Sequence, residues 1–105
     1  MANIPGTDLD VYPLNLGTNI FGFTADKSAS FQIMDQYAEA GGNFIDTADS
    51  YSAWAPGNVG GESETIIGQW LRERGNRADI VVATKVGAHP EFKGPMTPIT
   101  ARAAA

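Results

Sequence analysis

A chain of 105 residues is long enough for one domain and too short for two domains with separate cores. Its 12 acidic and 7 basic residues give a net charge of −5, and the basic residues are too scattered to suit the phosphate backbone of a nucleic acid. A hydrophobic fraction of 43% is typical of a globular protein, and the absence of cysteine excludes disulfides and thiolate metal sites.

The sequence gives no sign of export or of membrane insertion. The first twenty residues contain Asp8 and Asp10 and lack a basic start followed by an apolar stretch. The longest apolar run after them, residues 80–83, is far shorter than the ~20 residues that a membrane-spanning helix needs. We therefore expect a cytoplasmic protein whose partners include neither a membrane nor a nucleic acid.

The first elements are predicted over residues 4–42. Residues 4–17 alternate between apolar and polar side chains around two turn signals, which predicts a short hairpin followed by a strand near residues 14–16. Asp26 or Ser28 can cap a helix that Gly41 and Gly42 end. The apolar positions of this helix recur at helical spacing, at Phe31, Met34, Tyr37 and Ala38.

The stretch GNFIDTADSY, residues 42–51, joins a buried strand to a polar turn. Phe44 and Ile45 are typical of the end of an interior strand, and the hydroxyl and carboxyl side chains after them favour a turn. Asp46 should therefore lie at the carboxyl end of the strand and Tyr51 on the loop beyond it. Ligands bind at that end of the strands in parallel α/β folds.

The second half predicts a loop, a helix and a strand. Residues 52–61 are rich in glycine and proline, and we expect them to be exposed and mobile. Ser63 can cap a helix that ends at Gly75-Asn76, and this helix has one apolar face. Residues 80–84 are typical of a strand covered on both faces, and Lys85 follows them. The apolar face comprises Ile66, Ile67, Trp70 and Leu71.

Strands and helices alternate, which predicts an α/β fold with a parallel sheet of about three strands. Asp46, Tyr51 and Lys85 then fall at the same end of neighbouring strands, and we call them the strand-end trio. After residue 85 the chain is rich in glycine and proline, and Thr97-Pro98 predicts a short helix to residue 105. Phe31 and Trp70 are expected in the core.

The strand-end trio has a chemistry of its own. A tyrosine hydroxyl has a pKa of ~10, and a nearby ammonium lowers this value by stabilising the phenolate. A carboxylate beside the lysine keeps the lysine charged and oriented. Such a group suits protonation of a carbonyl oxygen during reduction. The alternative is that Asp46 and Lys85 form a structural ion pair while Tyr51 covers a loop.

Several motifs of this chain resemble the aldo-keto reductases in order and spacing, over residues 4 to about 90. The resemblance implies a (β/α) TIM barrel and NADPH-dependent reduction of aldehydes and ketones. The matching motifs are Leu16-Gly17-Thr18, residues 42–51, Gly61-Glu62-Ser63-Glu64 followed by Ile67-Gly68, and Ala83-Thr84-Lys85-Val86.

The same resemblance implies roles for individual residues. Tyr51 would be the proton donor, with Lys85 and Asp46 as its tuning partners. Gly17, Thr18 and Asp46 would lie near the nicotinamide of NADP, and Trp54 would line the pocket of a small carbonyl substrate.

The chain also departs from the family. The family's catalytic histidine has no counterpart, because it belongs to a later strand, and the phosphate-binding half of the barrel is missing. We therefore predict a partial (β/α) TIM-barrel fragment over residues 1–93, with an N-terminal hairpin, about three parallel strands and two helices, and an unrelated tail over residues 94–105. The cut sheet would expose edges and an apolar face, which predicts completion by self-association as a homodimer or homotetramer.

Two weaker motifs and two other functions stay open. Residues 57–61 could bind an anion at a helix start, and His89 is a weak candidate metal ligand. The chain is interpreted as a truncated aldo-keto reductase whose present redox activity is doubtful. The alternatives are a small oligomeric protein with a new hydrolytic or metal-assisted activity, and a non-catalytic fragment.

Overall fold

The computed structural model describes residues 1–85. The short helix predicted from the Thr97-Pro98 cap through residues 99–105 and the predicted boundary at residue 93 lie outside this part. The described part contains five strands, two α-helices and a short 3-10 helix, and strands and α-helices alternate from β3 onward. In chain order they are β1 (Ala2–Asn3), β2 (Asp10–Val11), β3 (Leu16–Gly17), α1 (Lys27–Glu39), β4 (Phe44–Asp46), α2 (Glu62–Arg74), η1 (Arg77–Asp79) and β5 (Val81–Ala83).

Strand β4 is the middle of a parallel sheet with the order β3-β4-β5. Leu16, Ile45 and Val82 form one row across this sheet. The next row consists of Gly17, Asp46 and Ala83. Strands β1 and β2 pair separately as an antiparallel hairpin, so the predicted hairpin and three parallel strands are confirmed.

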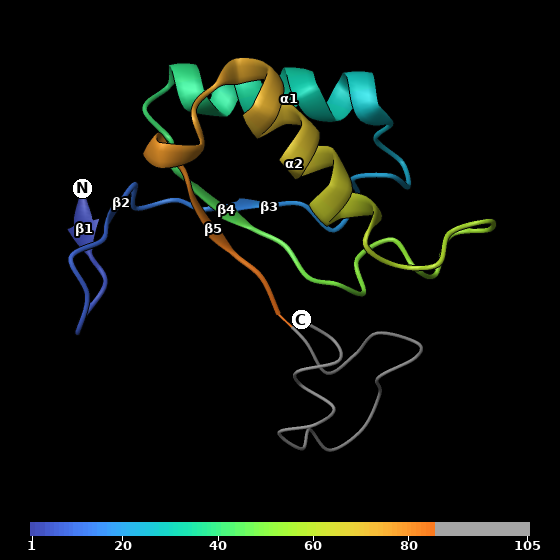
Figure 1. The fold of residues 1–105 in the computed structure, drawn as a ribbon, viewed down its shortest axis with the longest axis horizontal. Coiled ribbons are helices and arrows are strands. Elements are labelled where there is room, and N and C mark those ends of the chain that lie inside the picture. The colour runs from blue at the N-terminus through green and yellow to red at the C-terminus, as the bar shows by residue number, and fades with distance from the viewer. Residues whose placement is uncertain (86–105) are drawn as a thin grey trace.

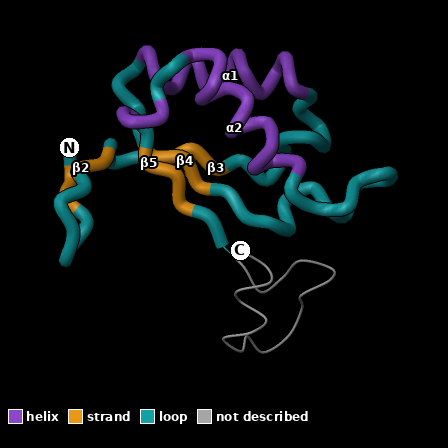
Figure 2. The backbone as a smooth tube through the Cα atoms, viewed as in Figure 1, coloured by secondary structure: helices purple, strands orange, loops and turns teal. Residues whose placement is uncertain are grey.

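Both helices cover the same face of this sheet, as Figures 1 and 2 show. The row of Leu16, Ile45 and Val82 packs against the core beneath the helices, and Ile45 is fully buried there. Phe31 and Trp70 belong to the same core, as predicted. Because successive strand residues point to opposite faces, Asp46 and its neighbours in the next row point away from the helices.

Helix α1 begins and ends at the residues that the sequence predicts. The carboxylate of Asp26 accepts a hydrogen bond from the backbone N–H of Ala29, at 2.8 Å, and so caps the helix. At the other end Gly41 has φ +98°, and the N–H groups of Gly41 and Gly42 bond back to the carbonyls of Ala38 and Tyr37. This Schellman arrangement turns the chain into β4.

Helix α2 begins differently from the prediction. Its N-cap is Gly61, with φ +81°, and no side chain caps the helix. Ser63, the predicted cap, lies inside the first turn and is fully buried. The cap prediction was wrong because the hydroxyl of Ser63 bonds to two other hydroxyls instead. The C-terminal prediction is confirmed, since Gly75 ends the helix in the left-handed conformation.

The loop over residues 52–61 was predicted to be exposed, but it is exposed only in part. Ser52 is buried, and its hydroxyl donates to the carbonyl of Phe21 at 2.6 Å. Asn58 donates to the carbonyls of Gly22 and Ser52. These contacts fasten the loop to the segment after β3, which is distant in sequence.

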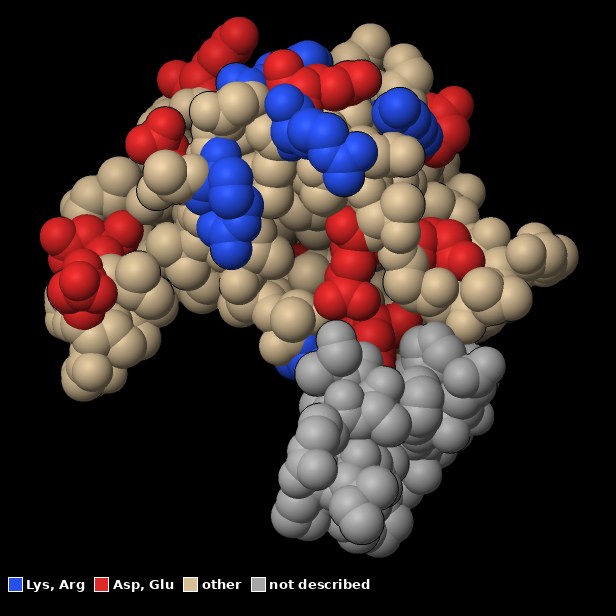
Figure 3. Space-filling view, viewed as in Figure 1, with Lys and Arg blue, Asp and Glu red and all other residues tan. Residues whose placement is uncertain are grey.

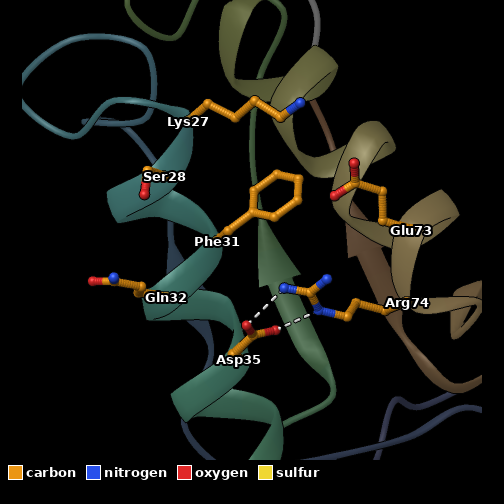
Figure 4. Close-up of a pocket in the computed structure, with 7 residues that line it drawn as sticks. All are labelled: Lys27, Ser28, Phe31, Gln32, Asp35, Glu73 and Arg74. Atoms are coloured by element: carbon orange, nitrogen blue, oxygen red, sulfur yellow. Dashed lines mark hydrogen bonds and ion pairs between the residues drawn. The ribbon is translucent and has the colours of Figure 1, made fainter.

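The outer faces of α1 and α2 carry an open pocket of about 470 Å³ (Figure 4). At its base Arg74 binds Asp35 through two hydrogen bonds of 2.9 Å, and the indole of Trp70 donates to the same carboxylate at 2.8 Å. The ring of Phe31 lies between the cations of Lys27 and Arg74. This contact joins the two helices on the side away from the sheet.

The surface around this pocket carries charges of both signs. On the described part of the face in Figure 3, basic and acidic side chains are interspersed over the helices, without a continuous basic surface. None of the helices within residues 1–85 has the length and apolarity needed to cross a membrane.

The ion pair of Asp35 predicts a stability that depends on pH. The hydrogen bonds from Arg74 and Trp70 lower the pKa of Asp35 from 3.8 to about 2. A carboxylate with a lowered pKa stabilises the fold above its ordinary pKa, and this contribution is lost as the pH falls from about 4 to about 2.

We therefore expect Asp35→Asn to lower the urea midpoint at pH 7, and the difference from the wild type to shrink between pH 4 and pH 2. The effect should be small, because the Asp35 and Arg74 side chains are 36% and 41% exposed. Circular dichroism in urea measures it, with Asp8→Asn as the control. A difference that stays constant with pH would contradict this role of Asp35.

Candidate functional site

The strand-end trio comes together at the carboxyl end of the sheet, with Asp46 at its centre. Asp46 is the last residue of the middle strand, so its neighbours arrive from both sides. Lys85 donates to one carboxylate oxygen at 2.6 Å, and the hydroxyl of Tyr51 donates to the other at 3.1 Å. The predicted proximity of these three side chains is thus present in the structure.

Lys85 is held by the backbone just after β4 as well as by the side chain of Asp46. Its ammonium also donates to the carbonyl of Thr47 at 2.8 Å. Partial burial lowers the pKa of Lys85, but the hydrogen bond to Asp46 and the neighbouring Tyr51 raise it by more, so this pKa lies above its ordinary value. Lys85 is therefore charged at neutral pH.

Asp46 lies between the other two members of the trio. Lys85 faces the ring of Tyr51, with the ammonium nitrogen 5.0 Å from the ring centroid. The Tyr51 hydroxyl is hydrogen-bonded to Asp46. The lysine thus meets the tyrosine through the face of its ring, and the carboxylate connects their polar atoms.

A buried hydroxyl network lies beneath Asp46, made by Thr18, Thr47 and Ser63. The hydroxyl of Ser63 lies 2.7 Å from that of Thr18 and 2.8 Å from that of Thr47. Thr18 in turn donates to the carbonyl of Asp46 at 2.8 Å. All three residues are at most 1% exposed. The network therefore fixes the ends of β3 and β4 against the start of α2.

Gly17 and Thr18, both predicted to lie near the nicotinamide, are neighbours with different surroundings. Gly17 pairs with Asp46 across the sheet, and a Cβ added at Gly17 would meet no atom within 4 Å. The backbone of Gly17 is thus open to a flat ligand. The side chain of Thr18 belongs to the hydroxyl network and faces the interior.

The cations of residues 1–85 bear on whether this end of the sheet could hold the phosphates of a dinucleotide. Among the described cations only Lys85 contacts Asp46 and Tyr51, and Asp46 and Thr47 already accept hydrogen bonds from its ammonium. Arg74 is bound to Asp35, and Arg77 donates to the carbonyl of Ile80 beyond the far end of α2. Apart from the paired Lys85, the described residues therefore provide no cation in contact with the strand-end trio for the phosphates of NADP.

An aromatic patch borders the trio, formed by Phe23, Tyr51 and Trp54. The ring of Trp54 contacts both others edge to face, with centroids 6.1 Å from Phe23 and 6.5 Å from Tyr51. Phe23 is 48% exposed and Trp54 is 56% exposed. Trp54, predicted to bind substrate, thus lies beside the proposed proton donor with an open apolar surface.

The anion-binding motif at residues 57–61 gains no support. The N–H groups of Val59 and Gly60, which an anion would need, already donate to the carboxylate of Glu62 at 3.0 and 2.8 Å. No group of three or more metal-binding side chains occurs within residues 1–85. His89 lies outside the described residues.

Two residues near the site were not recognised from the sequence. Ser63 was interpreted as a helix cap, and only its distances to two threonines that are remote in sequence reveal the hydroxyl network. Asp49 was interpreted as a turn residue, but it is 8% exposed and neither carboxylate oxygen has a hydrogen-bond partner within the described part of the chain. An unpaired buried carboxylate is costly, and local sequence patterns do not reveal it.

Comparison with known proteins identifies the family of this chain. The profile of the "Aldo/keto reductase family" matches residues 13–104. The chain belongs to this family. The matched stretch runs past residue 93, and the predicted division at that position stays a prediction.

Individual relatives differ greatly in length. An "uncharacterized 11.2 kDa protein" of Pseudescherichia vulneris is 54% identical over 89 residues, which cover 84% of this chain and 86% of that protein. "Aryl-alcohol dehydrogenase [NADP(+)]" of Phanerodontia chrysosporium is 44% identical, over 77% of this chain and 21% of that enzyme. This chain therefore spans about a fifth of the enzyme that it resembles.

Solved structures agree with the predicted fold. The structure of an aldo-keto reductase from Bacillus halodurans matches with a TM-score of 0.63 and 38% identity, over 78% of this chain and 24% of that one. The predicted partial (β/α) barrel fragment is thus confirmed.

The contact between Asp46 and Lys85 predicts coupled mutational effects. Their side chains are 28% and 51% exposed, so we expect a coupling free energy on the order of 0.2–1 kcal/mol. Lys85→Met alone should destabilise the fold more than Asp46→Asn and Lys85→Met together, because the single change leaves a carboxylate without its cation. Urea midpoints of the wild type, both single variants and the double variant measure this.

The pH dependence of the free energy of unfolding is a second test of the contact between Asp46 and Lys85. A lysine with a raised pKa stabilises the fold fully below its ordinary value of 10.5, and this contribution is lost as the pH rises through the higher folded value. Lys27→Met is a matched control, since Lys27 makes no ion pair within residues 1–85. Strictly additive effects of the two site variants would mean that Asp46 and Lys85 are not in contact in solution.

Proposed function

We propose that this chain carries the carbonyl-binding and proton-donating part of an aldo-keto reductase site. The observation that carries this proposal is the shared carboxylate of Asp46, which holds Tyr51 and Lys85 at hydrogen-bonding distance. By ancestry the activity is NADPH-dependent reduction of aldehydes and ketones, and the chain acts in the cytoplasm.

The chemistry at Tyr51 follows from its contacts. Its hydroxyl donates to Asp46 over 3.1 Å, a length at which a stronger acceptor can compete. A carbonyl oxygen that gains negative charge is such an acceptor, and it would take the hydrogen bond and then the proton. The charged Lys85, above the ring, would stabilise the resulting phenolate, while Asp46 keeps the lysine in place.

The aromatic patch favours an aromatic carbonyl compound. A planar substrate can place its ring on Trp54 and Phe23 and direct its oxygen toward Tyr51. The name of the fungal relative, an aryl-alcohol dehydrogenase, agrees with this substrate class.

Titration with acetophenone, followed by NMR, tests the proposal. We expect the indole N–H signal of Trp54 and the ring signals of Tyr51 to shift with an affinity near 1 mM, about −4 kcal/mol. The signals of Trp70 should not move, because this residue is 1% exposed. Tyr51→Phe should weaken binding at least about threefold, as expected for the loss of one hydrogen bond, and Tyr12→Phe should leave it unchanged. Absence of any shift at millimolar ketone would favour a non-catalytic fragment.

Binding of NADPH by this chain alone should be weak. The cation at the strand-end trio, Lys85, is already paired with Asp46, and the net charge of −5 repels a polyanion. Calorimetry with NADPH should give no saturable heat, with a full-length aldo-keto reductase as the positive control. A tight stoichiometric complex would show that the chain or its assembly has a complete cofactor site.

A further inference from the structure

Strand β5 is an edge of the sheet that residues 1–85 form. The N–H of Val81 donates to the carbonyl of Asn43 at 2.7 Å, and the carbonyl of Ala83 accepts from Thr47 at 2.8 Å. Because alternate residues of a strand bond to opposite sides, the N–H and C=O of Val82 point away from β4. No other strand within residues 1–85 pairs there. Such an edge is a template for another strand.

A groove of about 170 Å³ runs along this edge, between β5 and α2. Its floor is apolar, formed by Ile67, Leu71 and Val82. Gly68 adds open space, since a Cβ placed there would meet no atom within 4 Å. We call this the β5 groove.

The two ends of the β5 groove carry opposite charges. Glu64, in the first turn of α2, lies at the carboxyl end of β5, where it accepts a hydrogen bond from Thr84 at 2.8 Å. Arg77 lies at the other end, where it donates to the carbonyl of Ile80 just before the strand begins. Neither residue makes an ion pair within the described residues.

We propose that a second copy of this chain docks on this edge through a two-fold axis at Val82. The two β5 strands would pair antiparallel, and each Val82 would exchange N–H and C=O bonds with its partner. A two-fold axis perpendicular to the strand exchanges the ends of the groove. Arg77 of each protomer then meets Glu64 of the other, so the charges of one edge complement a second copy of the same edge.

Charge reversal tests the pairing without removing the strand. Arg77→Glu and Glu64→Arg should each weaken the dimer at least about tenfold, because both interprotomer contacts become repulsive. A mixture of the two variants should dimerise as well as the wild type, since every contact in the mixed dimer joins opposite charges. Sedimentation velocity from micromolar to millimolar concentration measures dimerisation of the wild type, of each variant alone and of their mixture. Arg72→Glu is the control for Arg77→Glu, because it changes the net charge by the same amount and lies outside the groove.

Each outcome decides the proposal. Recovery of the dimer in the mixture supports it, and circular dichroism first verifies that both variants fold. If Glu64→Arg does not fold, the pair Glu64→Gln and Arg77→Gln should each weaken the dimer. A wild-type monomer at millimolar concentration would overturn the proposal and point to residues 86–105 as the cover of this edge. A dimer that is insensitive to both charge reversals would overturn it in favour of assembly through β3 or the open sheet face.

Discussion

The site depends on one constraint, the parallel pairing of β4 with β3 on one side and with β5 on the other. Asp46 ends this strand, and the register places Gly17 and Ala83 beside it in one row. Lys85 follows β5 by two residues, so the same register brings its ammonium to the carboxylate. A slip of one residue would turn Asp46 toward the helices and Ile45 out of the core. Burial of Ile45 thus also fixes the position of the polar group beside it.

The hydroxyl network adds rigidity where the strands are short. The strands β3 and β4 contain two and three residues, too few for backbone pairing alone to hold their ends. Ser63 connects both ends to the first turn of α2 through buried hydrogen bonds. In a dry interior such bonds are strong and their loss is costly, so the network can hold Asp46 in a defined position.

Features with local causes were predictable from the sequence. Asp26 and the pair Gly41-Gly42 set the limits of α1 through contacts within a few residues. The positions of Asp46 and Lys85 at strand ends followed from the same kind of local pattern. The burial of Ser52 and of Ser63 was not predictable, because their partners lie tens of residues away in sequence. Hydrogen bonds between residues far apart in sequence can be recognised only in the folded structure.

The central claim is that the strand-end trio stays assembled in this chain, which spans about a fifth of the length of the aryl-alcohol dehydrogenase. The most direct measurement is the nuclear Overhauser effect between the ε-methylene protons of Lys85 and the ring protons of Tyr51. With the ammonium nitrogen 5.0 Å from the ring centroid, we predict a clear cross-peak. Its absence, in a spectrum that still shows the contact between Thr47 and Ala83 across the sheet, would contradict the account.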